Sequence, residues 1–243
     1  MTEYVAGIDG CRSGWVAVIY PLGAPEQAEV RLLATFADIL ALPEQPAAIA
    51  IDIPIGLPDQ TGIGGRDADI AARRVLGARQ SSVFAVPSRA AVACADYGDA
   101  CARAFETSDP PRKVSKQAFN IFPKIREVDA LMTPALQDRV REVHPEVAFW
   151  ALNGCEPIAT PKKIKSRINP DGMAERRRLL AKAGFTDAFL NAKHLLAKHA
   201  GADDILDATV NSWTASRLMR GDAIRFPELP TRDARGLRLE IWG

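Results

Sequence analysis

Four aspartates in three separate segments of the sequence could together hold a divalent cation. Asp9 ends an apolar run near the start of the chain, Asp52 lies within IAIDIPIGL, and Asp204 and Asp207 stand three apart in DDILDATVNSW. Mg²⁺ and Mn²⁺ prefer such carboxylate oxygens. Two such ions about 4 Å apart can activate water and stabilise the leaving oxygen in phosphodiester cleavage. The four aspartates are therefore our candidate metal ligands and catalytic residues.

Each aspartate also has a structural explanation. An Asp–Gly pair such as the one at Asp9 commonly ends a strand in an Asx turn. Acids in the first turn of a helix interact favourably with the helix dipole, which explains Asp204 more readily than Asp207, one turn further in. Asp52 is harder to explain, because its two neighbours are isoleucines that favour burial. A buried carboxylate without a partner costs on the order of several kcal/mol, so Asp52 needs an arginine or a cation beside it.

Helical periodicity over residues 203–220 places the last pair of acids on one face. At 100° per residue, Asp207 and Asn211 fall within about 60° of Asp204. The apolar residues of the same stretch lie on roughly the opposite side: Leu206, Val210 and Trp213. We therefore expect the acidic stripe to face away from the apolar stripe, and Asp203 to cap the helix.

A further acid, Glu146, follows His144 and Pro145 at the start of the run VAFWAL, which we expect to form a strand over residues 146–152. Residues two apart in a strand share a face. Glu146 could then be another metal ligand or catalytic carboxylate, and His144 could orient water or contact the substrate. The alternative is a turn before the strand with exposed polar side chains, and the sequence leaves both interpretations open.

Several basic residues are candidates for binding phosphate groups of a substrate. Arg66 and Arg73 follow the segment that carries Asp52, and Lys116 lies in SKQ. Arginine forks suit phosphate oxygens, although pairing with nearby acids on exposed helices is the simpler explanation. The best candidate for a nucleic-acid surface is a basic loop and the segment after it: Lys162, Lys163, Lys165, Arg167 and residues 176–178.

The composition is that of an ordinary globular protein. Of the 243 residues, 47% are hydrophobic and 25% are charged, and the net charge of +1 neither indicates nor excludes a nucleic-acid partner. No apolar run approaches membrane-spanning length and no basic-then-apolar leader opens the chain. The four cysteines form no CxxC pair, which argues against structural zinc. We expect a cytoplasmic protein with reduced thiols and no membrane association.

The order of expected elements predicts the fold. Strands are expected over residues 5–9, 15–20, 28–34, 47–53 and 146–152. Helices are expected over residues 36–42, 67–76, 88–97, 99–106, 115–121, 125–141, 172–183, 186–199 and 203–220, with an edge strand over 237–242. A β-β-β-α-β core followed by a fifth strand among helices is the order of the ribonuclease H-like fold. We predict a single α/β domain over residues 1–243, with a mixed five-stranded sheet flanked by helices and a helical insertion at roughly 60–140.

Six segments of the sequence resemble the DUF429 family of predicted ribonuclease H-like nucleases: GIDGCRSGWV, IDIPIGLP, RDADIAARRVLGARQSSVF, SKQAFNIFPKIREVDALM, VHPEVAFWALNG and DDILDATVNSWTA. The last segment also resembles the acidic final helix of Holliday-junction resolvases, where two aspartates stand three apart as Asp204 and Asp207 do. Such resolvases generally carry Glu on the fourth strand, where this chain has Asp52. The shorter side chain would require a closer approach of the metal.

These features lead to three hypotheses of function. The first, which the resemblance supports, is a nuclease that depends on Mg²⁺ or Mn²⁺ and hydrolyses phosphodiester bonds of DNA or RNA. The second is a small-molecule phosphotransferase of the actin-like or sugar-kinase type, whose first strand also ends in Asp-Gly. Such proteins need two copies of the core, whereas the sequence contains one. The third is a non-catalytic binding module that retains the fold.

Overall fold

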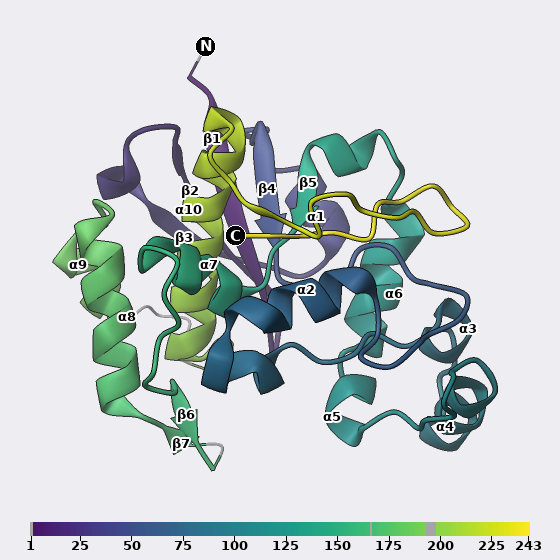
Figure 1. Cartoon of the computed structure of the whole chain (residues 1–243). Helices are drawn as coiled ribbons and strands as arrows, with labels where there is room; N and C mark the ends of the chain where they lie inside the picture. Colours follow the sequence, from purple (N-terminus) through teal and green to yellow (C-terminus); the bar gives the residue numbers. More distant parts are fainter. Residues whose placement is uncertain (1, 166, 193–197) are drawn as a thin grey trace.

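A five-stranded mixed sheet forms the centre of the computed structural model, which describes residues 2–165, 167–192 and 198–243. Its strands are β1 (Tyr4–Cys11), β2 (Gly14–Pro21), β3 (Glu29–Leu33), β4 (Ala48–Ile51) and β5 (Val140–Glu142). They lie in the order β3-β2-β1-β4-β5 (Figure 1). β1 is antiparallel to β2 and parallel to β4, and β4 is parallel to β5. This topology confirms the predicted ribonuclease H-like arrangement.

Helices and short strands connect and follow the sheet. Before β4 lie η1 (Pro25–Gln27) and α1 (Phe36–Leu40). Between β4 and β5 the chain forms α2 (Asp67–Val75), η2 (Gly77–Ser82), α3 (Arg89–Val92), α4 (Tyr97–Glu106), α5 (Lys116–Phe119), α6 (Phe122–Leu131) and η3 (Leu136–Asp138). After β5 follow α7 (Pro145–Leu152), β6 (Lys163–Ile164), β7 (Arg167–Ile168), α8 (Pro170–Lys182), α9 (Asp187–Asn191), α10 (Ala202–Arg220), β8 (Arg225–Phe226) and β9 (Ile241–Trp242).

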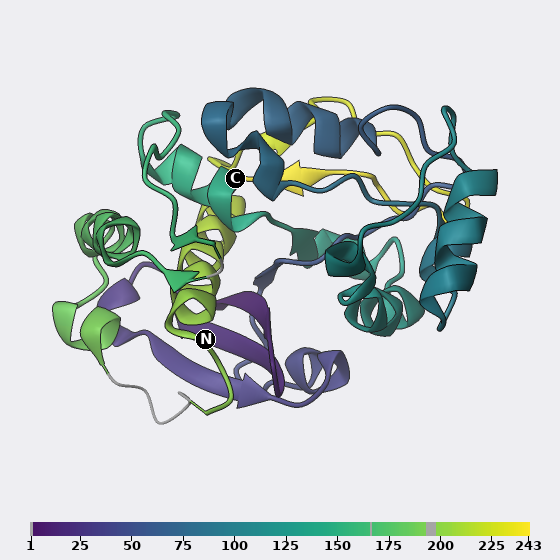
Figure 2. The ribbon, with the colours of Figure 1, turned by 90° about the horizontal axis from the view of Figure 1, so that it is seen from below.

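Helices cover both faces of the sheet. Side chains of a strand point alternately to its two sides, and in the central strands both sets are apolar and need to be buried. Ile8 of β1 packs in one buried cluster with α1 and α6, through residues such as Phe36 and Phe122. Val5 of the same strand packs in a second cluster, which includes Leu206 of α10. Figure 2 shows α10 and α1 against opposite sides of the strands. Burial on both faces explains the nearly continuous apolar runs of β1 and β4.

The contact between α10 and β1 is unusually close because it involves Gly7. A Cβ atom at this position would lie 1.9 Å from the backbone nitrogen of Ser212 and 2.2 Å from the carbonyl oxygen of Ala208. At the same contact, the side chain of Asn211, which precedes Ser212, donates a hydrogen bond to the Ile8 carbonyl (3.0 Å). The absence of a side chain at Gly7 thus lets α10 lie directly on the strand that ends in the first candidate acid.

The expected strand over residues 146–152 is wrong. These residues form α7, and the fifth strand is Val140–Glu142, which overlaps the end of the helix that we expected over residues 125–141. Pro145 occupies the first turn of α7, and the ring of His144 caps it by accepting a hydrogen bond from the Glu146 amide (3.2 Å). Periodicity alone could not distinguish a short buried helix from a buried strand in the apolar run VAFWAL.

Other element boundaries also differ from the prediction. The helix expected over 186–199 ends at Asn191 as α9, and residues 193–197 of that range lie outside the described residues. The helix expected over 125–141 ends at Leu131, three residues before Pro134. Of the edge strand expected over 237–242, only β9 forms, and it pairs with β8. No helix in the described part of the chain is long and apolar enough to cross a membrane.

The close approach at Gly7 predicts that Gly7→Ala strongly destabilises the protein. The added methyl group would overlap backbone atoms of α10, which cannot rotate away as a side chain can. We expect the free energy of unfolding, measured by urea denaturation, to fall by about 3 kcal/mol or more. Gly62→Ala is the control, since no described atom lies within 4 Å of its added Cβ. Equal stabilities of the two variants would contradict the proposed packing.

Candidate active site

Three of the candidate acids lie together at one edge of the sheet. Asp9 is at the carboxyl end of β1, Asp52 directly follows the parallel neighbour β4, and Asp207 lies in the second turn of α10. The backbone amide of Asp52 donates to the Ile8 carbonyl (3.0 Å), so the two strands end side by side. Asp9 and Asp207 are 8% and 3% exposed, whereas Asp52 is half-buried. We call Asp9, Asp52 and Asp207 the acidic cluster.

The acidic cluster is electrostatically strained. Burial raises the pKa of Asp9 well above its ordinary value, and the charges of Asp52 and Asp207 raise it further. Burial, with the nearby charge of Asp207, raises the pKa of Asp52 to about 8. Burial also raises the pKa of Asp207 to about 6, although a lysine opposes this shift. At neutral pH Asp52 therefore retains its proton, chiefly because burial disfavours the charged carboxylate and further because the acids repel one another.

The lysine beside Asp207 is Lys162. Its ammonium group forms an ion pair with Oδ2 of Asp207 and lowers the pKa of both Asp9 and Asp52. The other oxygen of Asp207, Oδ1, is buried and has no hydrogen-bond partner among the described residues. The sequence predicts Lys162 only as one member of a basic loop. Its place among the acids was not predicted, because 45 residues separate it from Asp207.

Asp204 and Asp203 lie next to the acidic cluster but have other partners. Asp204 accepts a hydrogen bond from the Gly201 amide (2.8 Å), and Gly201, not Asp203 as we expected, is the residue that caps α10. Asp203 instead pairs with Lys163 at 2.5 Å. Asp204 remains close enough to Asp9 that its charge raises the pKa of Asp9. A role at the start of the helix therefore explains Asp204 better than Asp207.

Glu146 and His144 do not share a strand face, because both belong to the start of α7. Both carboxylate oxygens of Glu146 accept hydrogen bonds from the guanidinium of Arg176, at 2.7 and 2.9 Å. Both side chains are buried. His144 lies against the Ser82 carbonyl through Nε2 (3.2 Å), and burial lowers the pKa of His144 to about 4. A neutral ring and a fully paired carboxylate favour structural roles for these two residues over catalysis.

The arginines expected to bind substrate are engaged within the fold. Arg66 is 3% exposed and pairs with Asp69 (2.7 Å) and Glu142 (2.5 Å). Arg73 donates to the carbonyls of Val83 (2.8 Å) and Gly64 (2.6 Å). The geometry thus favours structural roles for both, in place of the substrate contacts suggested by their position after Asp52. Lys116 is exposed on α5, with its ammonium group 5.9 Å from the centre of the Tyr97 ring.

Glu142 is an acid that the sequence analysis did not identify. It is the last residue of β5, opposite Ile51 of β4, and so lies at the same sheet edge as Asp52. Its carboxylate accepts from the Ile55 amide (2.6 Å) and pairs with Arg66. Burial raises the pKa of Glu142 to about 7 even so. The residue was missed because the fifth strand was expected six residues later.

A cation-lined hollow adjoins the acids at the start of α10. It has a volume of about 240 Å³ and is lined by Arg12, Lys163, Lys198, His199, Asp203 and Asp204 among others. Arg12 lies in the turn between β1 and β2, and Lys198 in the segment before α10. Positive side chains from three separate segments therefore border the acidic edge, which suits a negatively charged substrate.

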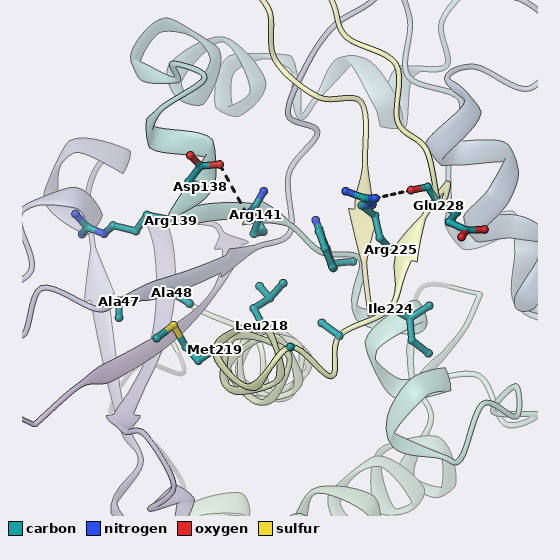
Figure 3. A pocket seen from close by; sticks show the side chains of 13 residues that line it. Ala47, Ala48, Asp138, Arg139, Arg141, Leu218, Met219, Ile224, Arg225 and Glu228 are labelled. Atoms are coloured by element: carbon teal, nitrogen blue, oxygen red, sulfur yellow. Dashed lines mark hydrogen bonds and ion pairs between the residues drawn. The ribbon is translucent and has the colours of Figure 1, made fainter.

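A larger cavity of about 660 Å³ lies at the opposite end of α10 (Figure 3). It is bordered by Ala48 at the start of β4 and by Leu218 and Met219 of α10. Arg141 and Arg225 flank the ring of Trp242, with 5.5 and 5.6 Å from guanidinium to ring centre. The described residues that line this cavity include none of the acidic cluster, so its size does not make it the candidate active site.

The acidic cluster suits a hard divalent cation by residue type and location. Its donors are carboxylate oxygens from three elements, and the buried Oδ1 of Asp207 is available to a cation. Within residues 2–165, 167–192 and 198–243, however, no three His, Cys, Asp or Glu side chains are arranged so that they could hold a metal ion. Asp207 instead pairs with Lys162, whose ammonium group provides the positive charge nearest to it.

Comparison with known proteins agrees with the resemblance noted in the sequence. A family model described as "Protein of unknown function (DUF429)" matches residues 7–232. The chain belongs to the DUF429 family. No curated protein and no solved structure matches it. The DUF429 match includes the whole acidic cluster, Lys162 and α10.

The buried ion pairs of Arg66 predict that this DUF429 protein is destabilised by Arg66→Met. Removing the guanidinium leaves Glu142 and Asp69 buried beside each other without their shared cation. We expect the free energy of unfolding in urea to fall by about 3–5 kcal/mol. The exposed Arg112→Met is the matched control and should change it by less than about 0.5 kcal/mol. A loss below about 1 kcal/mol for Arg66→Met would contradict the buried ion pairs, because that is the contribution of solvent-exposed pairs.

The raised pKa of Asp52 predicts a pH-dependent effect of Asp52→Asn. Between the ordinary pKa of 3.8 and about 8, Asp52 is protonated in the folded protein and ionised in the unfolded chain. The folded state then binds more protons, so stability falls as pH rises through this window. In the presence of a chelator, we expect Asp52→Asn to be more stable than wild type by about 2 kcal/mol at pH 8.5 and equally stable at pH 4. The exposed Asp59→Asn controls for loss of a charge, and a gain independent of pH would contradict the shift.

Proposed function

We propose that this DUF429 protein is a hydrolase of phosphodiester bonds in nucleic acid that depends on Mg²⁺ or Mn²⁺. The observation that carries the proposal is the acidic cluster, in which carboxylates from β1, β4 and α10 meet at one sheet edge with too little positive charge. Membership of the DUF429 family and the ribonuclease H-like sheet topology support it.

Asp9, Asp52 and Asp207 would hold the cation, with Asp204 beside them. Such an ion supplies positive charge that stabilises the negative charge developing on the phosphoryl oxygens. The chain's own contribution is to keep three carboxylates together on rigid elements, at the cost of raised pKa values. Because Asp52 carries a proton at neutral pH without the ion, binding of the cation would release that proton.

Substrate binding is assigned to the hollow beside the acids rather than to Arg66 and Arg73. Arg12, Lys163 and Lys198 line this hollow and could contact successive phosphates of a nucleic-acid strand. Lys116 and His144 lack a comparable position: one lies on α5 and the other is buried at the start of α7. The four cysteines are free thiols, which is consistent with a cytoplasmic location.

One observation favours the non-catalytic alternative. The ion pair with Lys162 already neutralises one member of the acidic cluster, as a binding module that never takes a metal would require. The phosphotransferase alternative has no comparable support, since the described residues contain one five-stranded sheet where that class needs two copies of the core. Metal binding therefore distinguishes the two remaining functions.

The nuclease proposal predicts metal-dependent cleavage that requires the acidic cluster. Labelled single-stranded, duplex and branched DNA and RNA are incubated with the purified protein and Mg²⁺ or Mn²⁺. We expect cleavage that a chelator abolishes and that Asp9→Asn or Asp207→Asn lowers at least about 100-fold, because each removes a direct ligand. Asp59→Asn, outside the site, should retain full activity. The absence of cleavage of every substrate, or equal cleavage by the Asp9 and Asp207 variants, would overturn the proposal.

A further inference from the structure

We infer that a pocket among the helices between β4 and β5 binds one nucleotide of a single-stranded segment beside the acidic cluster. Residues of α4 and α5 border it, and we call it the α4–α5 pocket. It has a volume of about 250 Å³ and is lined by Thr61, Phe84, Val86, Ser108, Arg112 and Ser115 among others. The inference rests on the proposed function and names its substrate class, a nucleic acid with an unpaired strand.

One part of the α4–α5 pocket is apolar and suits a nucleobase. Val86, Val114 and Ala118 line it and are buried. Phe84 lies beside them and is half-buried, and among the described residues its ring stacks on no other ring. Every base has a flat face that can stack on such a ring, so this contact does not depend on the base sequence.

The rim of the α4–α5 pocket is positively charged and suits a phosphate group. Arg112 and Lys113 line it, and the described residues of the lining include no acid. Both side chains are exposed, and in the described part of the chain neither has an ion pair or a hydrogen bond. Asp69 lies behind the lining, but it is fully buried and pairs with Arg66. Unlike Arg66, the guanidinium of Arg112 is therefore available to phosphate oxygens.

The segment that carries the two cations is held in place by its own backbone contacts. The Asp109 amide donates to the Thr61 carbonyl (2.9 Å). The Ser108 hydroxyl donates to the Ala104 carbonyl at the end of α4 (2.7 Å) and accepts from the Arg112 amide (2.7 Å). The wall of the pocket is thus formed before a ligand binds, which lowers the entropic cost of binding.

The α4–α5 pocket adjoins the acidic cluster. Phe84 and Val86 also line a smaller hollow, and Asp52 lines that hollow with them. Figure 1 shows α4 and α5 on one side of the lower end of the sheet, and β6 and β7, which carry Lys163, on the other side. A strand bound on both sides therefore passes the acids. A base that is paired and stacked within a duplex cannot enter a pocket, which favours an unpaired strand.

The closing experiment measures binding without cleavage. Fluorescence anisotropy follows a short labelled single strand, and its blunt duplex, as protein is added at several salt concentrations with a chelator present. We expect Phe84→Leu to weaken binding of the single strand about 5-fold or more and to leave binding of the duplex unchanged, because only the stacked base is lost. Arg112→Gln should lower the slope of log affinity against log salt for the single strand by about 0.7, the value for one phosphate contact. Phe105→Leu and Arg74→Gln are the matched controls, since both residues are exposed outside the pocket lining, and both variants should bind as wild type does.

The other outcomes separate the pocket from the proposed function. An unchanged affinity of Phe84→Leu for the single strand, or an equal loss for the duplex, would overturn the nucleotide pocket even if the protein cleaves nucleic acid. An unchanged salt slope for Arg112→Gln would overturn it as well, and this exposed residue can be tested even if Phe84→Leu does not fold. If the binding results are as expected but no substrate is cleaved with Mg²⁺ or Mn²⁺, the proposed function fails and the pocket stands. If wild type binds neither nucleic acid, both fail.

Discussion

The contact between the backbone of α10 and Gly7 of β1 is the constraint on which the candidate site depends. It brings the second turn of the helix to the end of the strand, and so brings Asp207 to Asp9. The hydrogen bond from Asn211 to the Ile8 carbonyl holds α10 at the same position along β1. The helix is buried along both its acidic and its apolar sides, and this packing must offset the unfavourable crowding of carboxylates.

The acids at this edge of the molecule fall into two groups that differ in how their charge is compensated. Glu142 and Glu146 each pair with a buried arginine that belongs to the fold, Arg66 and Arg176. The acidic cluster instead has one lysine for three carboxylates, and the remaining strain is visible as pKa values of about 8 for Asp52 and about 6 for Asp207. Arg66 also pairs with Asp69, and burial still raises the pKa of Glu142 to about 7, so the difference between the two groups lies in their partners: the glutamates have arginines of the fold, whereas the acidic cluster shares one lysine.

The first four strands and α10 were predicted well, whereas the fifth strand, α9 and the C-terminal edge strand were not. β1 to β4 and α10 have strong local signals: apolar runs, a hairpin turn and a long helical period. Residues 146–152 were predicted as a strand because the run is mostly apolar. In the structure they form a helix, which the ring of His144 caps. This error hid Glu142, since the true fifth strand ends there.

The sequence alone determined which acids could act and which elements carry them, because residue type and short-range periodicity are local properties. It predicted Asp9, Asp52, Asp204 and Asp207 as one group through the topology that those elements imply. Only the tertiary structure decided the partner of each charge. Arg66 pairs with Glu142 across 76 residues, Arg176 with Glu146 across 30, and Lys162 with Asp207 across 45. Such pairs form where folded elements meet, and no local pattern records which of many basic residues will lie within reach of a given carboxylate.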